Sequence, residues 1–134
     1  MLKIYYNHMK IVNTKNAAEA RGHYSQAIAC DGLLFISGQL PISADGTHNY
    51  DKSFEEQAER VLANLNAILQ AGGSYRENLL KVTVYIADLS KWGVFNEIYS
   101  RFMGEHKPAR AVVPVPELHY GYQLEIEAIA KINE

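Results

Sequence analysis

The sequence predicts an α+β fold in which two helices pack on one face of a mixed β-sheet. Two segments have apolar residues at helical spacing, and several shorter runs are rich in β-branched residues. Along the chain the expected order is hairpin, helix, strand, helix, strand, strand. A chain of 134 residues fits one domain, and we expect it over 9–134, after an irregular N-terminal extension at 1–8.

Strands open the predicted domain. A short β-type run covers 10–13, and the runs SQAIAC and LLFISG follow at 25–30 and 33–38. Asp31 and Gly32 join these two runs, and both residue types tolerate the positive φ that a tight hairpin turn requires. The sequence therefore predicts a β-hairpin, followed by a surface loop over 41–53.

The first helix is predicted from the signals at its two ends. Ser53 is placed to accept a hydrogen bond from the backbone of Glu56, whose side chain reaches back to the Ser53 amide in a capping box. Gly72 and Gly73 favour termination. Between these ends the apolar residues recur at helical spacing, at Val61, Leu62, Leu65, Ile68 and Leu69.

The second half of the chain repeats the alternation of strand and helix. The run KVTVYIA at 81–87 is β-rich, and Ser90 is expected to start a helix that ends near Gly104. Two more strands are expected at about 110–115 and 123–132. On the second helix, one face carries Phe95, Ile98, Tyr99 and Phe102.

Two helices can cover only one face of such a sheet. Runs such as LLFISG and KVTVYIA are apolar at nearly every position, so the other face also needs a cover. We expect identical subunits to supply it. A closed homo-oligomer would bury that face and allow sites to form between subunits.

Composition narrows the classes of partner. The net charge of −2 and pI of about 6.2 give no electrostatic reason to expect nucleic acid or an anionic membrane. The single cysteine, Cys30, excludes an internal disulfide framework, so the cytoplasm is the default location. The histidines are scattered without metal-ligand spacing, and no apolar run is long enough to span a membrane.

Three charged residues stand in segments that otherwise read as buried strands: Arg110, Glu125 and Glu127. A lone buried charge costs several kcal/mol unless it is paired or bound by a ligand. Arg110 and Glu125 either form a structural ion pair between adjacent strands or bind a ligand. Glu127 shares a strand face with Glu125 and is interpreted as a structural or subunit-contact residue.

Several motifs together resemble one protein family. The segments GHYSQAI, FISGQLP, KVTVYIADLS, EHKPARAVVPV and LEIEAIA are similar, in this order, to the RidA (YjgF) family of reactive intermediate deaminases. The resemblance covers the chain from about Met9. It implies a chorismate-mutase-like α+β fold and a homotrimer with three clefts between neighbouring subunits.

The resemblance also implies a catalytic site. Arg110, in the P-A-R motif, would bind the carboxylate of a 2-imino acid, which suits the planar guanidinium fork. Glu125, in the E-I-E motif, would position or activate the water that attacks the imine carbon. Tyr24, in the Y-S-Q motif, would orient the substrate from the neighbouring subunit.

Further substrate contacts are implied around these three residues. Ser37 and Gly38 would line the cleft, with the glycine allowing close backbone approach. Val112 would contribute backbone polar groups, and Ser90 replaces an asparagine of the family's D-L-N motif. The implied reaction is hydrolysis of 2-iminobutanoate or 2-iminopropanoate to a 2-keto acid and ammonia, with neither cofactor nor metal.

The chain departs from the family pattern at a few positions. His23 replaces a proline, and Val112 replaces a small polar residue. The segment LHYGY brings in His119, Tyr120 and Tyr122, which are expected to flank the pocket or its entrance. These departures bear on the substrate's side chain more than on the reaction type.

Other interpretations stay open from sequence alone. Tyr24 could be a packed aromatic residue with a satisfied hydroxyl. The protein could be a non-catalytic regulatory trimer that uses Arg110 to bind keto or amino acids. Ribonuclease or translation inhibition is a further alternative, which the acidic balance and the lack of a basic patch disfavour.

Overall fold

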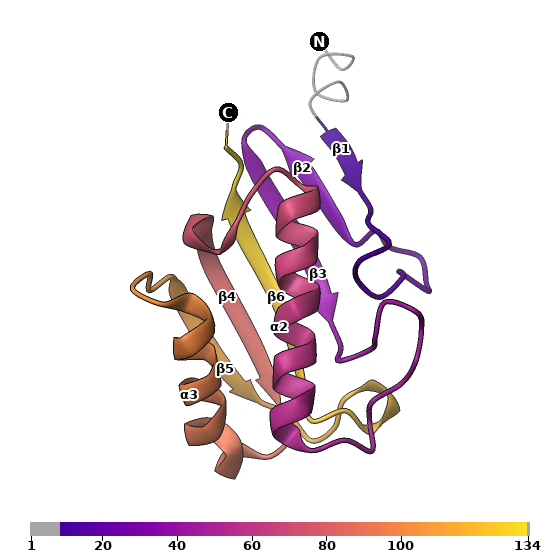
Figure 1. Cartoon of the computed structure of the whole chain (residues 1–134), viewed down its shortest axis with the longest axis vertical. Coiled ribbons are helices and arrows are strands. Elements are labelled where there is room, and N and C mark those ends of the chain that lie inside the picture. Colours follow the sequence, from indigo (N-terminus) through magenta and orange to yellow (C-terminus); the bar gives the residue numbers. More distant parts are fainter. Residues whose placement is uncertain (1–8, 134) are drawn as a thin grey trace.

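The computed structural model, which describes residues 9–133, contains one mixed six-stranded sheet with two helices on one face (Figure 1). The strand order is β1-β2-β3-β6-β4-β5, and all neighbours are antiparallel except β4 and β5. The predicted α+β fold is confirmed, and the expected extension at 1–8 lies outside the described residues. The strands are β1 Met9–Val12, β2 Ala27–Cys30, β3 Leu33–Gln39, β4 Leu79–Ile86, β5 Ala109–Pro114 and β6 Leu124–Lys131.

Helix α2, Phe54–Ala71, begins where its cap was predicted. The Ser53 hydroxyl oxygen accepts the backbone N–H of Glu56 at 3.1 Å. The return contact differs from the expected one, because the Ser53 hydroxyl donates to the Glu56 carboxylate at 3.2 Å. One N–H of the first turn is thereby satisfied, and the acidic side chain lies near the positive end of the helix.

Helix α3, Trp92–Met103, starts later than predicted. A 3₁₀ turn, η2 Leu89–Lys91, precedes it, and the Asp88 carboxylate accepts both the backbone N–H of Ser90, at 3.0 Å, and its hydroxyl, at 2.7 Å. The capping side chain is therefore Asp88, with Ser90 inside the turn. The other two 3₁₀ turns are η1 Arg76–Asn78 and η3 His119–Gly121.

Strand β6 lies between β3 and β4, and its side chains alternate between the two faces of the sheet. Its burial alternates strictly, as a half-buried strand requires. The side chains of Leu124, Ile126, Ala128 and Ala130 are buried beneath the helices, together with the apolar residues of α2 predicted above. Glu125, Glu127 and Ile129 occupy the alternate positions and face the other way.

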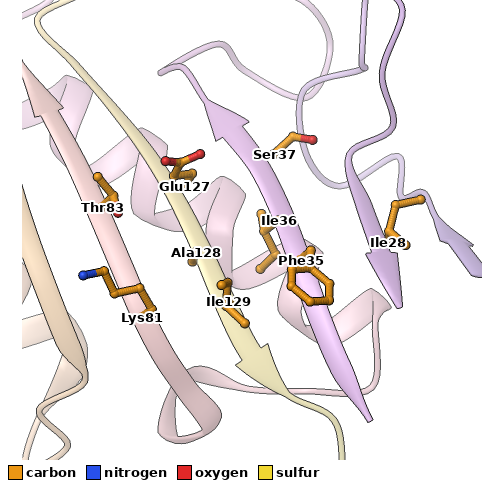
Figure 2. Close-up of a pocket in the computed structure, with 9 residues that line it drawn as sticks. All are labelled: Ile28, Phe35, Ile36, Ser37, Lys81, Thr83, Glu127, Ala128 and Ile129. Atoms are coloured by element: carbon orange, nitrogen blue, oxygen red, sulfur yellow. The ribbon is translucent and has the colours of Figure 1, made fainter. Parts of the chain in front are cut away.

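This second face of the sheet has no helix on it. Figure 2 shows Phe35 of β3 and Ile129 of β6 standing on this face, with Lys81 and Thr83 of β4 beside them. The side chains line a shallow pocket of about 350 Å³, and Phe35 is 42% exposed. Both helices thus cover one face, as the sequence predicted, and a partly apolar face is left open.

The close approach of Gly72 to strand β3 gives a test of the packing between α2 and the sheet. A Cβ atom at Gly72 would lie 2.6 Å from Leu34 Cδ2, whereas φ of −88° strains no ordinary residue. We expect Gly72→Ala to lower the free energy of unfolding by about 1–3 kcal/mol through overpacking, measured by urea denaturation.

Gly93→Ala is the matched control, because Gly93 is an exposed residue of α3 and its Cβ would meet nothing within 4 Å. This substitution should leave stability unchanged or raise it by up to about 1 kcal/mol, since alanine favours helix. Equal effects of the two substitutions would contradict the packing explanation.

Candidate functional site

A pocket of about 510 Å³ brings several of the predicted site residues together at one end of the open sheet face. Its walls include Tyr24, Ser37, Gly38 and Glu125, which come from segments far apart in the sequence. His119 of η3 also lines it. The remaining lining residues are Ala18, Glu19, Ala20, Gln26, Gln39, Leu40, Ile42 and Glu127.

An irregularity in strand β3 forms the floor of this pocket. Ile36 pairs with Ala128 and Gln39 pairs with Ile126, so β3 has one more residue than β6 between these two pairs. This bulge turns both Ser37 and Gly38 toward the pocket, while Ile36 and Gln39 stay buried.

Position 38 has no room for a side chain, because its backbone lies close to Glu125 of β6. A Cβ atom at this position would lie 3.0 Å from Glu125 Cδ and 3.1 Å from Glu125 Oε1. The sequence analysis expected this glycine to allow backbone approach to a substrate. In the structure it also makes room for the Glu125 carboxyl group.

Buried hydrogen bonds hold the segment that carries Tyr24. The side chain of Gln26 is buried; it accepts the Thr14 N–H at 2.7 Å and donates to the carbonyls of Thr14 and Ala18. The Ser37 hydroxyl donates to the Ser25 carbonyl at 2.6 Å. Since its proton is committed there, Ser37 offers the pocket an acceptor oxygen.

The electrostatics of the pocket are dominated by two glutamates. Burial raises the pKa of Glu125, the charge of Glu127 raises it further, and His119 acts in the opposite direction. The Tyr85 hydroxyl donates to Glu127 Oε1 at 2.6 Å, which in turn raises the pKa of Tyr85. Among the described residues no hydrogen bond reaches the Glu125 carboxyl, so Glu125 is the carboxylate left for a ligand or water.

Tyr24 lies at the pocket with 53% of its surface exposed. Its ring packs against Gly22, where a Cβ atom would lie 3.1 Å from Tyr24 Cε1. Such exposure disfavours the alternative of a packed core aromatic within one chain. The hydroxyl is free to meet a ligand or a second protein surface.

Arg110 is not brought to this pocket. It lies on edge strand β5, where it pairs with Val82 and shares the helix-facing side of the sheet. Its Nη1 donates to Asn96 Oδ1 at 2.9 Å, and its guanidinium lies 4.8 Å from the Tyr99 ring centroid. A separate pocket of about 550 Å³ surrounds it, with Lys107 in its wall.

The alternative of a structural ion pair between Arg110 and Glu125 is therefore wrong within one chain. Strand β4 separates β5 from β6, and the two side chains point to opposite faces of the sheet. The sequence analysis assumed that the last two strands are neighbours. They are not, because the β5–β6 connection crosses over β4.

Val112 and Ser90 have different surroundings. The Val115 N–H donates to the Ile86 carbonyl, so the backbone groups of Val115 point toward β4. Backbone groups alternate in direction along a strand, and Val112 lies three residues earlier. Its N–H and C=O therefore point to the free edge of the sheet. This direction suits the predicted backbone contact. Ser90 lines neither pocket and serves the turn before α3, so its substrate role stays a prediction.

The extra aromatic residues of LHYGY divide into two groups. Tyr122 is fully buried rather than at an entrance, and its hydroxyl accepts the Asn49 N–H at 3.0 Å and lies 2.8 Å from His48 Nδ1. Tyr120 is half exposed, and His119 reaches the pocket. His119 was expected to flank the pocket or its entrance and lines it, although the sequence analysis gave it no part in the reaction. Gln26 was assigned no role at all.

Within residues 9–133 no three His, Cys, Asp or Glu side chains gather as a metal-ion site would require. None of the helices described is long and apolar enough to cross a membrane.

Comparison with known proteins agrees with the resemblance noted in the sequence. The family model described as Endoribonuclease L-PSP matches residues 14–132. A RutC family protein of Pyrococcus horikoshii is 40% identical over 121 residues, covering 90% of this chain and 96% of its own. The 2-iminobutanoate/2-iminopropanoate deaminase of Rattus norvegicus is 38% identical over 121 residues, covering 90% and 88%.

Solved structures show the same arrangement of sheet and helices. The crystal structure of E. coli TdcF with bound serine superposes with a TM-score of 0.87 at 36% identity, covering 92% of this chain and 99% of that one.

The raised pKa of Glu125 makes a prediction about stability. Because the folded state holds the Glu125 proton more tightly than the unfolded chain does, stability falls as pH rises through the interval between the two pKa values. We expect Glu125→Gln to be more stable than the wild type at pH 7. The gain should disappear below about pH 4, where the carboxyl is protonated in both states.

Urea denaturation at fixed protein concentration, at both pH values, measures the difference. Glu117→Gln is the control, since Glu117 is exposed and lies outside the pocket. The prediction fails if Glu125→Gln shows the same pH dependence of stability as the wild type.

Proposed function

The chain belongs to the endoribonuclease L-PSP family, also known as the RidA or YjgF family, and on that premise we propose that it hydrolyses 2-imino acids to 2-keto acids and ammonia. The observation that carries the proposal is the Glu125 carboxyl, which has a raised pKa and, within residues 9–133, no hydrogen-bond partner, and which lies in one pocket with Tyr24 and Ser37. The deaminase name of the rat relative supports this class of reaction.

Glu125 acts on the water that attacks the imine. A carboxylate with a raised pKa is a stronger base near neutral pH, so it takes a proton from water as the oxygen adds to the imine carbon. The same proton then passes to the nitrogen, and ammonia leaves. Glu127 adds negative charge to the pocket, which favours the protonated and more electrophilic imine.

Arg110 and Glu125 meet between copies of the chain in this proposal. They lie on opposite faces of one sheet, so a single subunit does not bring the carboxylate-binding group to the water-activating group. A homotrimer whose subunits cover the open sheet face supplies both. Support comes from the uncovered Phe35 and Ile129, and from Arg110 and the backbone of Val112 on a free edge strand.

The substrates proposed are 2-iminobutanoate and 2-iminopropanoate, with Tyr24, Ser37, Gly38 and Ser90 as further substrate contacts. The reaction needs no cofactor, because a protonated imine is already electrophilic. The cytoplasm stays the predicted compartment, since the single Cys30 demands no oxidising environment.

A non-catalytic role in binding small acids is the second candidate. The serine bound in the TdcF structure favours it, because that relative is 36% identical and holds an amino acid. The endoribonuclease in the family's description gains no support from this chain's net charge of −2.

Semicarbazide competition tests the deaminase proposal. An amino-acid oxidase or dehydratase generates the imine, and the protein should speed its loss and reduce semicarbazone formation. Glu125→Gln should lower kcat by at least about 100-fold, as expected for loss of a general base. Arg110→Ala should lower kcat/KM by about 100-fold through loss of charged hydrogen bonds.

Arg101→Ala is the matched control, because Arg101 is an exposed arginine on α3 outside both pockets; it should keep wild-type activity. No acceleration by folded wild-type protein with either imine would overturn the proposal in favour of binding alone.

Subunit mixing tests where the site is completed. Arg110→Ala and Glu125→Gln chains, unfolded together and refolded in equal amounts, should regain activity at about a quarter of the sites, where one chain supplies Arg110 and its neighbour supplies Glu125. Each variant refolded alone should stay inactive. If the mixture is as inactive as its components, the site is not shared between chains.

A further inference from the structure

The pocket of Glu125 contains a histidine for which the proposed mechanism has no role. His119 belongs to the 3₁₀ turn η3, just before β6, and its side chain lines the pocket with Glu125 and Tyr24. The ring is exposed at the pocket rim, and among the described residues no hydrogen bond uses its nitrogens. Both nitrogens are therefore available to a ligand.

A row of tilted ring contacts connects His119 to the interior. Its ring lies 3.7 Å, centroid to centroid, from that of Tyr120, which lies 4.6 Å from the ring of His48. His48 Nδ1 in turn lies 2.8 Å from the hydroxyl of buried Tyr122. These contacts connect the pocket rim to buried Tyr122, and they favour the position of His119 beside the pocket.

The backbone that follows His119 is in a conformation that residues other than glycine rarely adopt. Tyr120 has φ of 61° and Gly121 has φ of 76°, so two successive residues are left-handed. A bulky residue in this region costs on the order of 1 kcal/mol and persists where the surroundings hold it. Such outliers gather at functional sites, which is why this turn calls for an explanation.

His119 also interacts electrostatically with the reacting carboxylate. Its charge opposes the rise in the pKa of Glu125 that burial and Glu127 produce. The ionisable groups facing it across the pocket are Glu19, Tyr24, Glu125 and Glu127, and Tyr120 lies behind its ring. Glu19 is itself 3.8 Å from Arg21 at the protein surface.

We propose that His119 is a second proton-transfer residue of this pocket, which takes the hydroxyl proton of the carbinolamine as the carbon–nitrogen bond breaks. The assignment rests on the imine hydrolysis proposed above. It adds a catalytic residue to Glu125 within the same pocket, at its exposed rim.

The proton balance shows why two groups are useful. Glu125 first removes a proton from the attacking water, which gives the neutral carbinolamine, and then gives that proton to the amino nitrogen. His119 accepts the hydroxyl proton while the C–N electron pair leaves with ammonia, and the C=O bond forms. The protonated His119 then gives its proton to ammonia, so one cationic imine and one water yield one keto acid and one ammonium ion.

The experiment compares His119→Ala and His119→Asn with the wild type in the semicarbazide assay across pH. We expect both variants to lower kcat by about 100-fold with little change in KM. On the acid side, kcat/KM of both variants should fall less with decreasing pH than that of the wild type, because the variants have no His119 to protonate. Added imidazole should restore activity to His119→Ala, because the exposed rim leaves room for it, after subtraction of the rate without enzyme.

Glu117→Gln is the control: Glu117 is an exposed ionisable residue two positions before His119 that lines neither pocket, and the substitution should keep the wild-type pH profile. An active wild type with unchanged kcat and pH profile in both His119 variants overturns this assignment and leaves the deaminase proposal intact. An inactive wild type overturns both. A loss of activity in His119→Ala that imidazole does not restore, with the pH profile unchanged, identifies a structural role and also overturns the assignment.

Discussion

The strict alternation of strand β6 is the constraint on which the rest of the structure depends. Leu124 and Ile126 lie beneath the helices, and Glu125 and Glu127 face the opposite side. A shift of one residue in its pairing with β3 and β4 would drive two carboxylates into the apolar layer under α2. The apolar positions of β6 therefore fix the register, and the register fixes where the acidic groups meet solvent.

Local patterns predicted most of the fold. The hairpin turn is one example, with Asp31 and Gly32 both at positive φ, and the Ser53 cap is another. Each depends on residues close together in sequence. The relation of Arg110 to Glu125 could not be predicted in this way, because it depends on β4 lying between β5 and β6. Strand order is decided by packing across the whole sheet, and adjacency in sequence is a poor guide to it.

The residues of the candidate site were predicted better than the irregular backbone that positions them. Glu125 and Gly38 were identified from motifs, but the β3 bulge that brings Gly38 against the carboxyl has no distinct sequence pattern. His119 was expected at the pocket or its entrance, but the conformation of its turn was not predicted, because Tyr120 adopts a positive φ that is uncommon outside glycine. Backbone hydrogen bonds from Gly121 to Leu118 and from Tyr122 to His119 close this turn, and the Tyr122 hydroxyl joins its end to Asn49 in a distant loop.

The hydrogen bond between the Tyr122 hydroxyl and the Asn49 backbone has a consequence for how such a protein diverges. It joins the long loop after β3 to the turn before β6, so a length change in one loop displaces the other. Strand β6 tolerates few replacements, because core residues and carboxylates alternate along it. New substrate preferences would therefore arise through paired changes in these two loops, with the sheet inherited unchanged.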